Sequence, residues 1–210
     1  MAQSRSSKLG SAQWAQLPGS QQEGQQVASL LTTSLLSGVE ATTTSLLKQQ
    51  GPLVLHVATH AFFVADQDKK TADRLRKVEG QTEQLKGLGE EDPQLRSGLV
   101  LAGANQPNLD PKDDGYLTAA EAVNLNLKGT ELVVLSACST GQGEARTGEG
   151  VYGLQRSLTV AGARSTLLSL WKVDDAATAA FMERYYRRLK AGESRSDALV
   201  TVQKEFRDGT

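Results

Sequence analysis

The single cysteine of this 210-residue chain, Cys138, stands where a strand is expected to give way to a loop. The apolar residues 131–137 precede it and the glycine-containing residues 139–143 follow it, a pattern typical of a buried strand that ends in a loop. A second apolar run covers residues 53–57, and His60 follows closely. Reacting groups in parallel α/β sheets gather beyond the carboxyl ends of the strands. If the two strands are neighbours, Cys138 and His60 form a dyad in which an imidazole activates a thiol nucleophile.

His56 is the other histidine of the chain, and it competes with His60 for the catalytic role. The two are four residues apart, which places them on the same face of an extended segment. Because His56 falls inside the expected strand, we interpret it as a hydrogen-bonded core residue and assign the catalytic role to His60. An isolated cysteine is more often an inert buried side chain than a nucleophile, so the role of Cys138 depends on what surrounds it.

The glycine-rich residues 141–150 invite comparison with a phosphate-binding loop. A Walker-type loop requires a lysine directly after its second glycine, and Glu149 stands there instead. We therefore disfavour nucleotide binding and interpret this loop as the rim of an active site.

Composition excludes several classes of protein. A formal net charge of −1 gives no reason to expect a nucleic acid or an anionic membrane as partner. One cysteine cannot form an internal disulfide, which favours a reducing compartment and hence the cytoplasm. No run approaches the ~20 apolar residues that span a bilayer. Two histidines and one cysteine without metal-ligand spacing predict neither a metal site nor another cofactor.

Expected strands and helices alternate from residue 53 onward, which predicts an α/β fold with a mostly parallel sheet covered by helices on both faces. Strands are expected at residues 35–36, 53–57, 97–102, 131–137 and 165–171. Helices are expected at residues 23–31, 41–50, 118–124 and 150–160, from a cap at Asp174 or Asp175 to Gly192, and at 194–207.

The chain is expected to form one domain, residues 23–210, preceded by a flexible segment, residues 1–22. Trp14 is a candidate for docking that segment onto the domain. Residues 66–96 alternate acids and bases, which indicates a charged surface insertion. A sharper hypothesis makes this insertion a lid or an autoprocessing segment, because it carries accessible lysines and arginines.

Several segments, in the same order, resemble the CHAT domain, a caspase-like family related to separase. They are residues 55–63, 97–105, 117–123, 132–143, 148–154, 162–165 and 169–175. The resemblance implies a caspase-like three-layer sandwich and thiol peptidase chemistry, with His60 and Cys138 at the catalytic positions. CHAT proteins often carry TPR repeats, so a TPR-type or other regulatory partner is an expectation.

The resemblance also implies an oxyanion hole made by the backbone N–H groups of Cys138 and Ala61. The family usually has glycine where Ala61 stands. If that position requires a positive φ, the alanine Cβ costs about 1–2 kcal/mol. The thiol and the imidazole are unaffected by this departure.

Four further residues are candidates for substrate binding. Asp174 and Asp175 are helix caps in the simpler interpretation, and carboxylates of a pocket for a basic P1 residue in the sharper one. Trp171 is a candidate for the wall of that pocket. Ser139 stands where some CHAT members have an acid, so a neutral or apolar P1 residue stays open.

Two functions follow from these residues. The first is a cysteine endopeptidase that hydrolyses a protein or peptide substrate through the Cys138–His60 dyad. The second is a non-catalytic caspase-like module that binds partners, with Ala61 as a first sign of lost activity.

Overall fold

The computed structural model describes residues 13–63, 93–95, 97–106, 113–139, 147–169 and 174–209. For residues 63, 93, 138, 139, 147–151 and 175 the description covers the backbone alone. The expected insertion 66–96 lies outside these stretches, apart from the short 3-10 helix η2 (Pro93–Leu95). Residues 141–146 of the expected active-site rim also lie outside.

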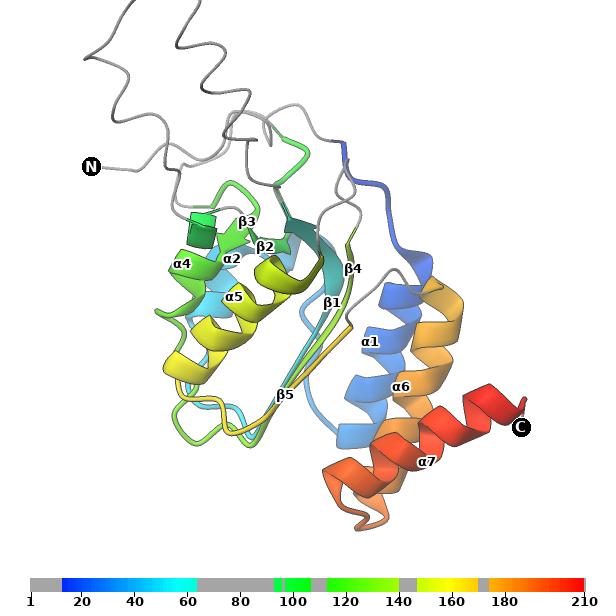
Figure 1. Ribbon diagram of the computed structural model, residues 1–210. Helices are drawn as coiled ribbons and strands as arrows, with labels where there is room; N and C mark the ends of the chain where they lie inside the picture. The colour runs from blue at the N-terminus through cyan, green and yellow to red at the C-terminus, as the bar shows by residue number, and fades with distance from the viewer. Residues whose placement is uncertain are drawn as a thin grey trace, which may run out of the picture.

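Five strands within the described residues form one mixed sheet in the order β3-β2-β1-β4-β5 (Figure 1). β1 pairs in parallel with β4, and β4 pairs in parallel with β5. β2 runs antiparallel to both β1 and β3. The other four strands therefore share one direction, which confirms the mostly parallel sheet. The strands are β1 (Val54–Phe63), β2 (Ser97–Val100), β3 (Tyr116–Thr118), β4 (Leu132–Ser139) and β5 (Thr166–Leu168).

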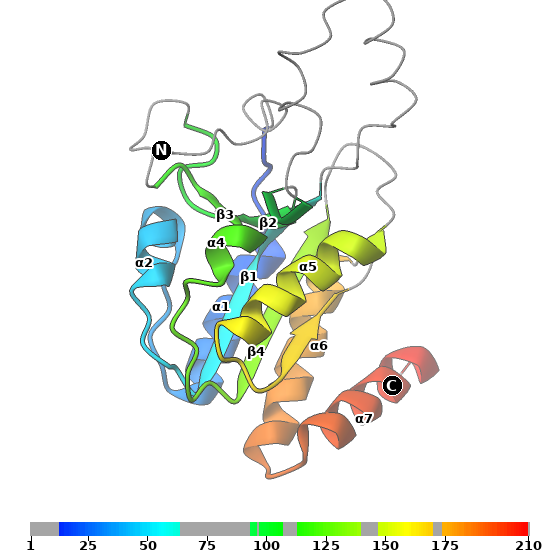
Figure 2. The same ribbon diagram turned by 60° about the vertical axis from the view of Figure 1, so that its left-hand side comes forward.

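Helices cover both faces of this sheet, which confirms the three-layer α/β sandwich (Figures 1 and 2). One face carries the helices α1 (Pro18–Leu31), α6 (Asp175–Lys190) and α7 (Arg195–Asp208). The other carries α2 (Thr43–Leu47), α4 (Ala119–Ala122) and α5 (Thr147–Val160), and a short 3-10 helix, η1 (Gly38–Glu40), precedes α2. Within the described residues, none of the helices combines the length and the apolar character needed to cross a bilayer.

Strand β4 is buried on both sides over residues 132–137, which explains why residues 132–135 are all apolar. Leu132 and Val134 pack with α1, α6 and α7, whereas Val133 and Leu135 pack with α2, α4 and α5. Each fully buried side chain of this size contributes about 1.5–3 kcal/mol to the hydrophobic stabilisation of the fold. The alternation fixes the register of the strand, because a slip by one residue would exchange its two faces.

Side chains cap several of the described helices, and the cap expected at Asp174 or Asp175 is Asp174. Thr118 and Glu121 form the reciprocal capping box at the start of α4. Asp174 caps α6 by accepting a hydrogen bond from the Ala177 N–H at 2.8 Å. Ser194 caps α7 in the same way.

Three elements differ from the expectation. The strand expected at Leu35–Leu36 is wrong, because these two leucines are 38% and 44% exposed and pair with no strand in the described chain. β3 forms at residues 116–118, where no strand was expected, because pairing with β2 stabilises a strand too short to show a pattern. β1 continues to Phe63, so His60 lies within the strand and not beyond it.

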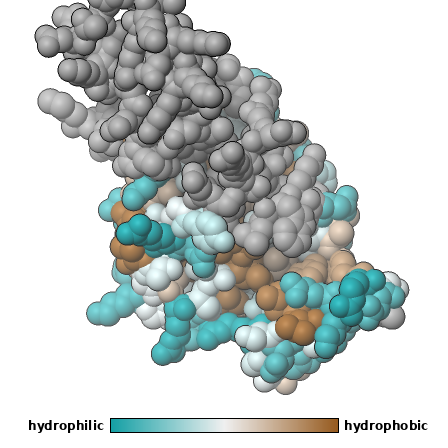
Figure 3. All heavy atoms as spheres, in the orientation of Figure 1, coloured by the Kyte–Doolittle hydropathy of each residue, from teal (hydrophilic) through white to brown (hydrophobic). Residues whose placement is uncertain are grey.

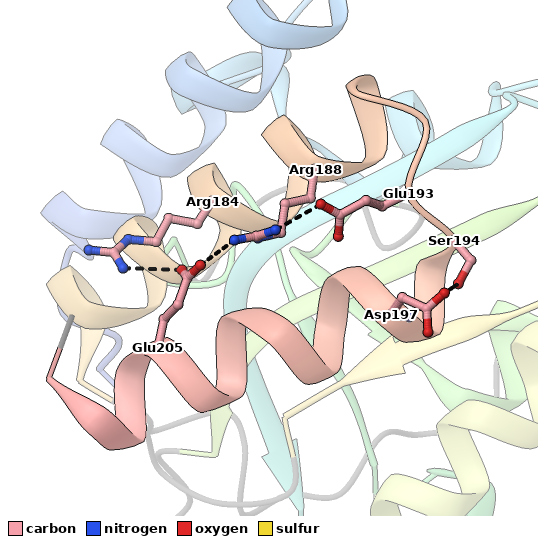
Figure 4. A network of polar contacts seen from close by, with 6 residues as sticks. All are labelled: Arg184, Arg188, Glu193, Ser194, Asp197 and Glu205. Atoms are coloured by element: carbon pink, nitrogen blue, oxygen red, sulfur yellow. Dashed lines mark hydrogen bonds and ion pairs between the residues drawn. The ribbon is translucent and has the colours of Figure 1, made fainter.

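α6 and α7 are joined by a polar network centred on Glu205 (Figure 4). Arg188 and Arg184 both donate hydrogen bonds to the Glu205 carboxylate, and Arg188 also binds Glu193 at 2.7 Å. The hydrogen bond from Arg188 outweighs desolvation and, with the bond from Arg184, lowers the pKa of Glu205. Hydrophilic side chains dominate the surface of this carboxyl-terminal region, with smaller hydrophobic patches between them (Figure 3).

Candidate active site

The two residues of the expected dyad lie directly opposite each other in the sheet. His60 of β1 and Cys138 of β4 are register partners in the parallel ladder. Adjacent strands are separated by about 4.8 Å, which is within reach of a contact between a thiol and an imidazole. Both residues stand near the carboxyl ends of their strands, since β1 ends at Phe63 and β4 at Ser139.

Positions 60 and 138 lie on the same face of the sheet as α1 and α6, which cover that face nearer the amino-terminal ends of β1 and β4. Side chains alternate along a strand, and Val134 and Ser136 of β4 both contact groups of that layer. Position 138 continues this series. His60 is buried, with 7% of its surface exposed. The cover above it therefore decides what can reach the imidazole.

The cover is an extended segment ahead of α1, which we name the amino-terminal arm, residues 13–17. The carbonyl oxygen of Ala15 lies 2.7 Å from His60 Nε2, and the Trp14 ring lies 5.4 Å from the imidazole, centroid to centroid. A carbonyl oxygen can only accept a hydrogen bond, so Nε2 carries a proton. In the neutral imidazole, Nδ1 is then the basic nitrogen.

Trp14 anchors the arm at two places. Its backbone N–H donates to Asn105 Oδ1, and Asn105 Nδ2 donates back to its carbonyl, each at 2.8 Å. Its indole Nε1–H donates to the Tyr116 hydroxyl at 3.0 Å. The expected docking of Trp14 is confirmed. Ala15 and Asn105 could not be predicted from the sequence, because a backbone acceptor leaves no side-chain signal and Asn105 falls outside the expected strands and helices.

Ala61, the expected oxyanion residue, lies inside the ladder of β1. It is in register with Leu99 on β2 and with Ser139 on β4, so its N–H lies in the plane of the sheet. Among the described residues, the non-glycine residue with a positive φ is Thr32. Ala61 therefore does not have the positive φ that would have strained an alanine. Its methyl group is buried in the core that faces α5.

A second polar cluster, which we name the Glu23 cluster, lies deeper on the same face as the dyad and consists of Glu23, His56, Ser136 and Tyr186. His56 Nε2 lies 2.9 Å from Glu23 Oε1, a close contact whose two atoms are not aligned for a hydrogen bond. His56 Nδ1 lies 3.0 Å from the Tyr186 hydroxyl, and Ser136 Oγ donates to Glu23 Oε2 at 3.0 Å. Burial raises the pKa of Tyr186, and neighbouring Tyr185 and Glu23 add to this effect. The interpretation of His56 as a core residue is confirmed.

Comparison with known proteins identifies the family. Residues 1–210 match the CHAT domain, over the whole chain. The chain belongs to the CHAT family. This family is related to the caspase-like peptidases, which agrees with the three-layer sandwich. No solved structure matches the chain significantly.

Two curated relatives of this CHAT domain carry the same name. Tetratricopeptide repeat protein 28 of Mus musculus is 36% identical over 97 residues, and that of Homo sapiens is 34% identical over 102 residues. These alignments cover 44% and 49% of the chain, and 4% of each relative. The chain therefore corresponds to a small part of these much longer proteins.

The structure describes the expected substrate-binding residues to different extents. Asp174 is exposed and its carboxylate caps α6, whereas Trp171 lies outside the described residues. Ser139 pairs with Ala61 across the ladder, and Asp175 begins α6, both described through their backbone. In the described part of the chain, no three histidine, cysteine or acidic side chains gather as metal ligands would.

Proposed function

We propose that this CHAT domain is a cysteine endopeptidase in which Cys138 is the nucleophile and His60 the general base. The observation that carries the proposal is the direct register of the two residues on adjacent parallel strands. A nucleophile and its base must lie within hydrogen-bond reach, and the neighbouring register positions of the two residues support this arrangement. Family membership among relatives of the caspase-like peptidases supports the same assignment.

The proposed reaction has two stages. His60 Nδ1 accepts the proton of the Cys138 thiol, and the thiolate attacks the carbonyl carbon of the scissile peptide bond. The tetrahedral intermediate collapses, the C–N bond breaks, and the proton on Nδ1 passes to the leaving amine. Water, deprotonated by Nδ1, then attacks the thioester, and release of the carboxylic acid product regenerates the thiol.

The Ala15 carbonyl supports both stages. It holds the neutral imidazole in the form protonated at Nε2, so that Nδ1 is the unprotonated, basic nitrogen. When Nδ1 gains a proton, the hydrogen bond from Nε2–H to Ala15 becomes charge-assisted and hence stronger. The contact therefore favours the protonated imidazole at the moment at which the reaction creates it.

The oxyanion of the intermediate requires N–H donors, and the proposed ones are the backbone N–H groups of Cys138 and Ala61. Because Ala61 pairs with strands on both sides, its N–H reaches an oxyanion above the sheet only after local opening of the ladder. The Cys138 N–H is the donor next to the reacting sulfur.

The proposed substrate is a protein or an extended peptide, cut in the reducing environment of the cytoplasm. A basic P1 residue would be bound by Asp174 and Asp175 beside Trp171, and a neutral P1 residue would suit the uncharged Ser139. Profiling a peptide library distinguishes the two, since cleavage that never follows lysine or arginine would end the first. The relatives' name supports a TPR-type regulatory partner.

Covalent labelling of Cys138 tests the catalytic proposal. The chain has one cysteine, so a peptide-based thiol electrophile reports on that residue without further engineering. We expect labelling of the wild type to exceed that of a free cysteine, and His60→Ala to lower the rate by about 10²-fold or more. Cys138→Ala is the blank. Equal labelling rates in wild type and His60→Ala would show an ordinary thiol and refute the proposal.

The second candidate is a non-catalytic caspase-like module that binds partners. The observation that favours it is the burial of His60 beneath the amino-terminal arm. This function predicts a labelling rate that is slow and independent of His60, so the same experiment separates the two.

A further inference from the structure

The Glu23 cluster has no part in the proposed reaction, although it shares two strands and one face with the dyad. His56 precedes His60 by four residues on β1, and Ser136 precedes Cys138 by two on β4. Glu23 comes from α1 and contacts both strands, with 1% of its surface exposed. One buried carboxyl group therefore ties α1 to the two strands that carry the dyad.

The side of α1 that faces the sheet is short of large apolar groups. Its buried residues are Gly19, Glu23, Gly24 and Val27, of which Val27 is the one with a sizeable apolar side chain. The partly buried Leu30 and Leu31 extend the contact at the far end of the helix. In the middle of α1, the position of the helix on the sheet is consequently set by the partners of Glu23. A buried polar group separated from its partners is unfavourable, which makes these contacts selective for one placement.

The amino-terminal arm is continuous with α1. Leu17 is the residue at the helix start, where its carbonyl accepts the hydrogen bond of the Gln21 N–H at 3.2 Å. Ala15 lies two residues before it and contacts His60 Nε2. At the opposite end, Lys190 Nζ of α6 binds the Leu30 carbonyl at 2.9 Å. α1 is thus held at its end and at its middle, and its first turn delivers Ala15 to the imidazole.

We propose that Glu23 is a positioning residue that, through His56 and Ser136, seats α1 so that the arm lies on His60 and the imidazole keeps its proton on Nε2. The consequence for Cys138 rests on the proposed peptidase function. The placement of the arm is measurable without any catalysis.

Nitrogen-detected imidazole spectra test this placement. The chain has two histidines, so the spectra contain two pairs of ring-nitrogen signals. In the neutral imidazole of wild-type His60 we expect the proton on Nε2. In Glu23→Gln we expect His60 to populate both tautomers, and acrylamide quenching of Trp14, measured in a Trp171→Phe background, to increase. We also expect Cys138 alkylation to slow on the order of tenfold. Glu183→Gln is the matched control, a half-buried glutamate of α6 paired with Arg187.

The His56 signal serves as an internal check, because Glu23 contacts it directly. If the His56 signal moves in Glu23→Gln while the His60 tautomer and Trp14 quenching stay as in the wild type, the proposal is overturned. Should Glu23→Gln fail to fold, Ser136→Ala and Tyr186→Phe each remove one hydroxyl from the cluster. The His60 tautomer and Trp14 quenching in these variants then test the proposal in the same way. If wild-type Cys138 reacts only as fast as a free thiol, the peptidase proposal fails, and the tautomer comparison still decides the role of Glu23.

Discussion

The contact between Glu23 and His56 makes a quantitative prediction about stability. The two side chains are 1% and 9% exposed, so removing either one leaves the other in a buried site. Breaking a buried pair in this way costs about 3–5 kcal/mol in the free energy of unfolding. In each alanine variant the remaining side chain still has one partner, Ser136 for Glu23 and Tyr186 for His56. We therefore expect each variant to lose about 3 kcal/mol, the lower end of this range. The double variant leaves neither group orphaned, so we expect a coupling energy of about 2 kcal/mol.

A double-mutant cycle measures that coupling. Urea-induced unfolding of the wild type, Glu23→Ala, His56→Ala and the double variant gives four free energies, provided that fluorescence and circular dichroism report the same transition. The control cycle uses Glu183 and Arg187, whose contact of 2.7 Å on α6 is exposed. A surface pair of this kind contributes about 0.3–0.5 kcal/mol.

The result that would refute this reasoning is a Glu23–His56 coupling as small as that of the control cycle. Such a result would mean that the contact between the two buried groups does not stabilise the fold. The docking of α1 would have to come from Val27, Leu30 and Leu31 together with the Lys190 contact. In that case the positioning role of Glu23 would lose its energetic basis.

Three further predictions concern other parts of the molecule. Ala61→Gly deletes a buried methyl group and makes the strand backbone more flexible, so we expect it to lower the free energy of unfolding by about 1–2 kcal/mol. We expect the rate of Cys138 alkylation to stay unchanged. Faster alkylation would show that the methyl group obstructs the site. The pKa of Glu205 is lowered in the folded state, so its stabilising contribution is present above the unfolded value and is lost as the pH falls through the folded pKa. Between about pH 5 and about pH 3, urea unfolding should therefore show a larger loss of stability for the wild type than for Glu205→Gln, and equal losses would contradict this. Thr118→Ala removes the cap of α4 and should destabilise the domain by about 1 kcal/mol, which an unchanged urea midpoint would disprove.

The strands that carry the dyad could be predicted from the sequence because most of their residues are apolar. Residues 131–137 and 53–57 are predominantly apolar runs, which are typical of strands inside an α/β sheet. Their neighbourhood was expected from the chemistry of Cys138 and His60, but the register was not. Register depends on how all side chains of both faces pack, and no local pattern carries that information.

The arm over His60 could not be predicted for a different reason. Its central contact uses the carbonyl of Ala15, and every residue of the chain has a carbonyl. The Asn105 amide that holds Trp14 is 91 residues away in sequence. Such contacts are specified by the folded arrangement of the sheet and not by residue type.

Two histidines on one face of one strand have different surroundings, and the difference follows from depth in the sheet. His56 lies where α1 and α6 cover the strand, and both ring nitrogens contact side chains from those helices. His60 lies beyond the start of α1, where an extended arm is the cover and Cys138 is the register partner. A short extended segment with few buried apolar contacts can open at far lower free energy than a helix packed in the core. The contact that fixes the His60 tautomer can therefore be broken without unfolding the layer that holds the ring in place, whereas the contacts of His56 cannot.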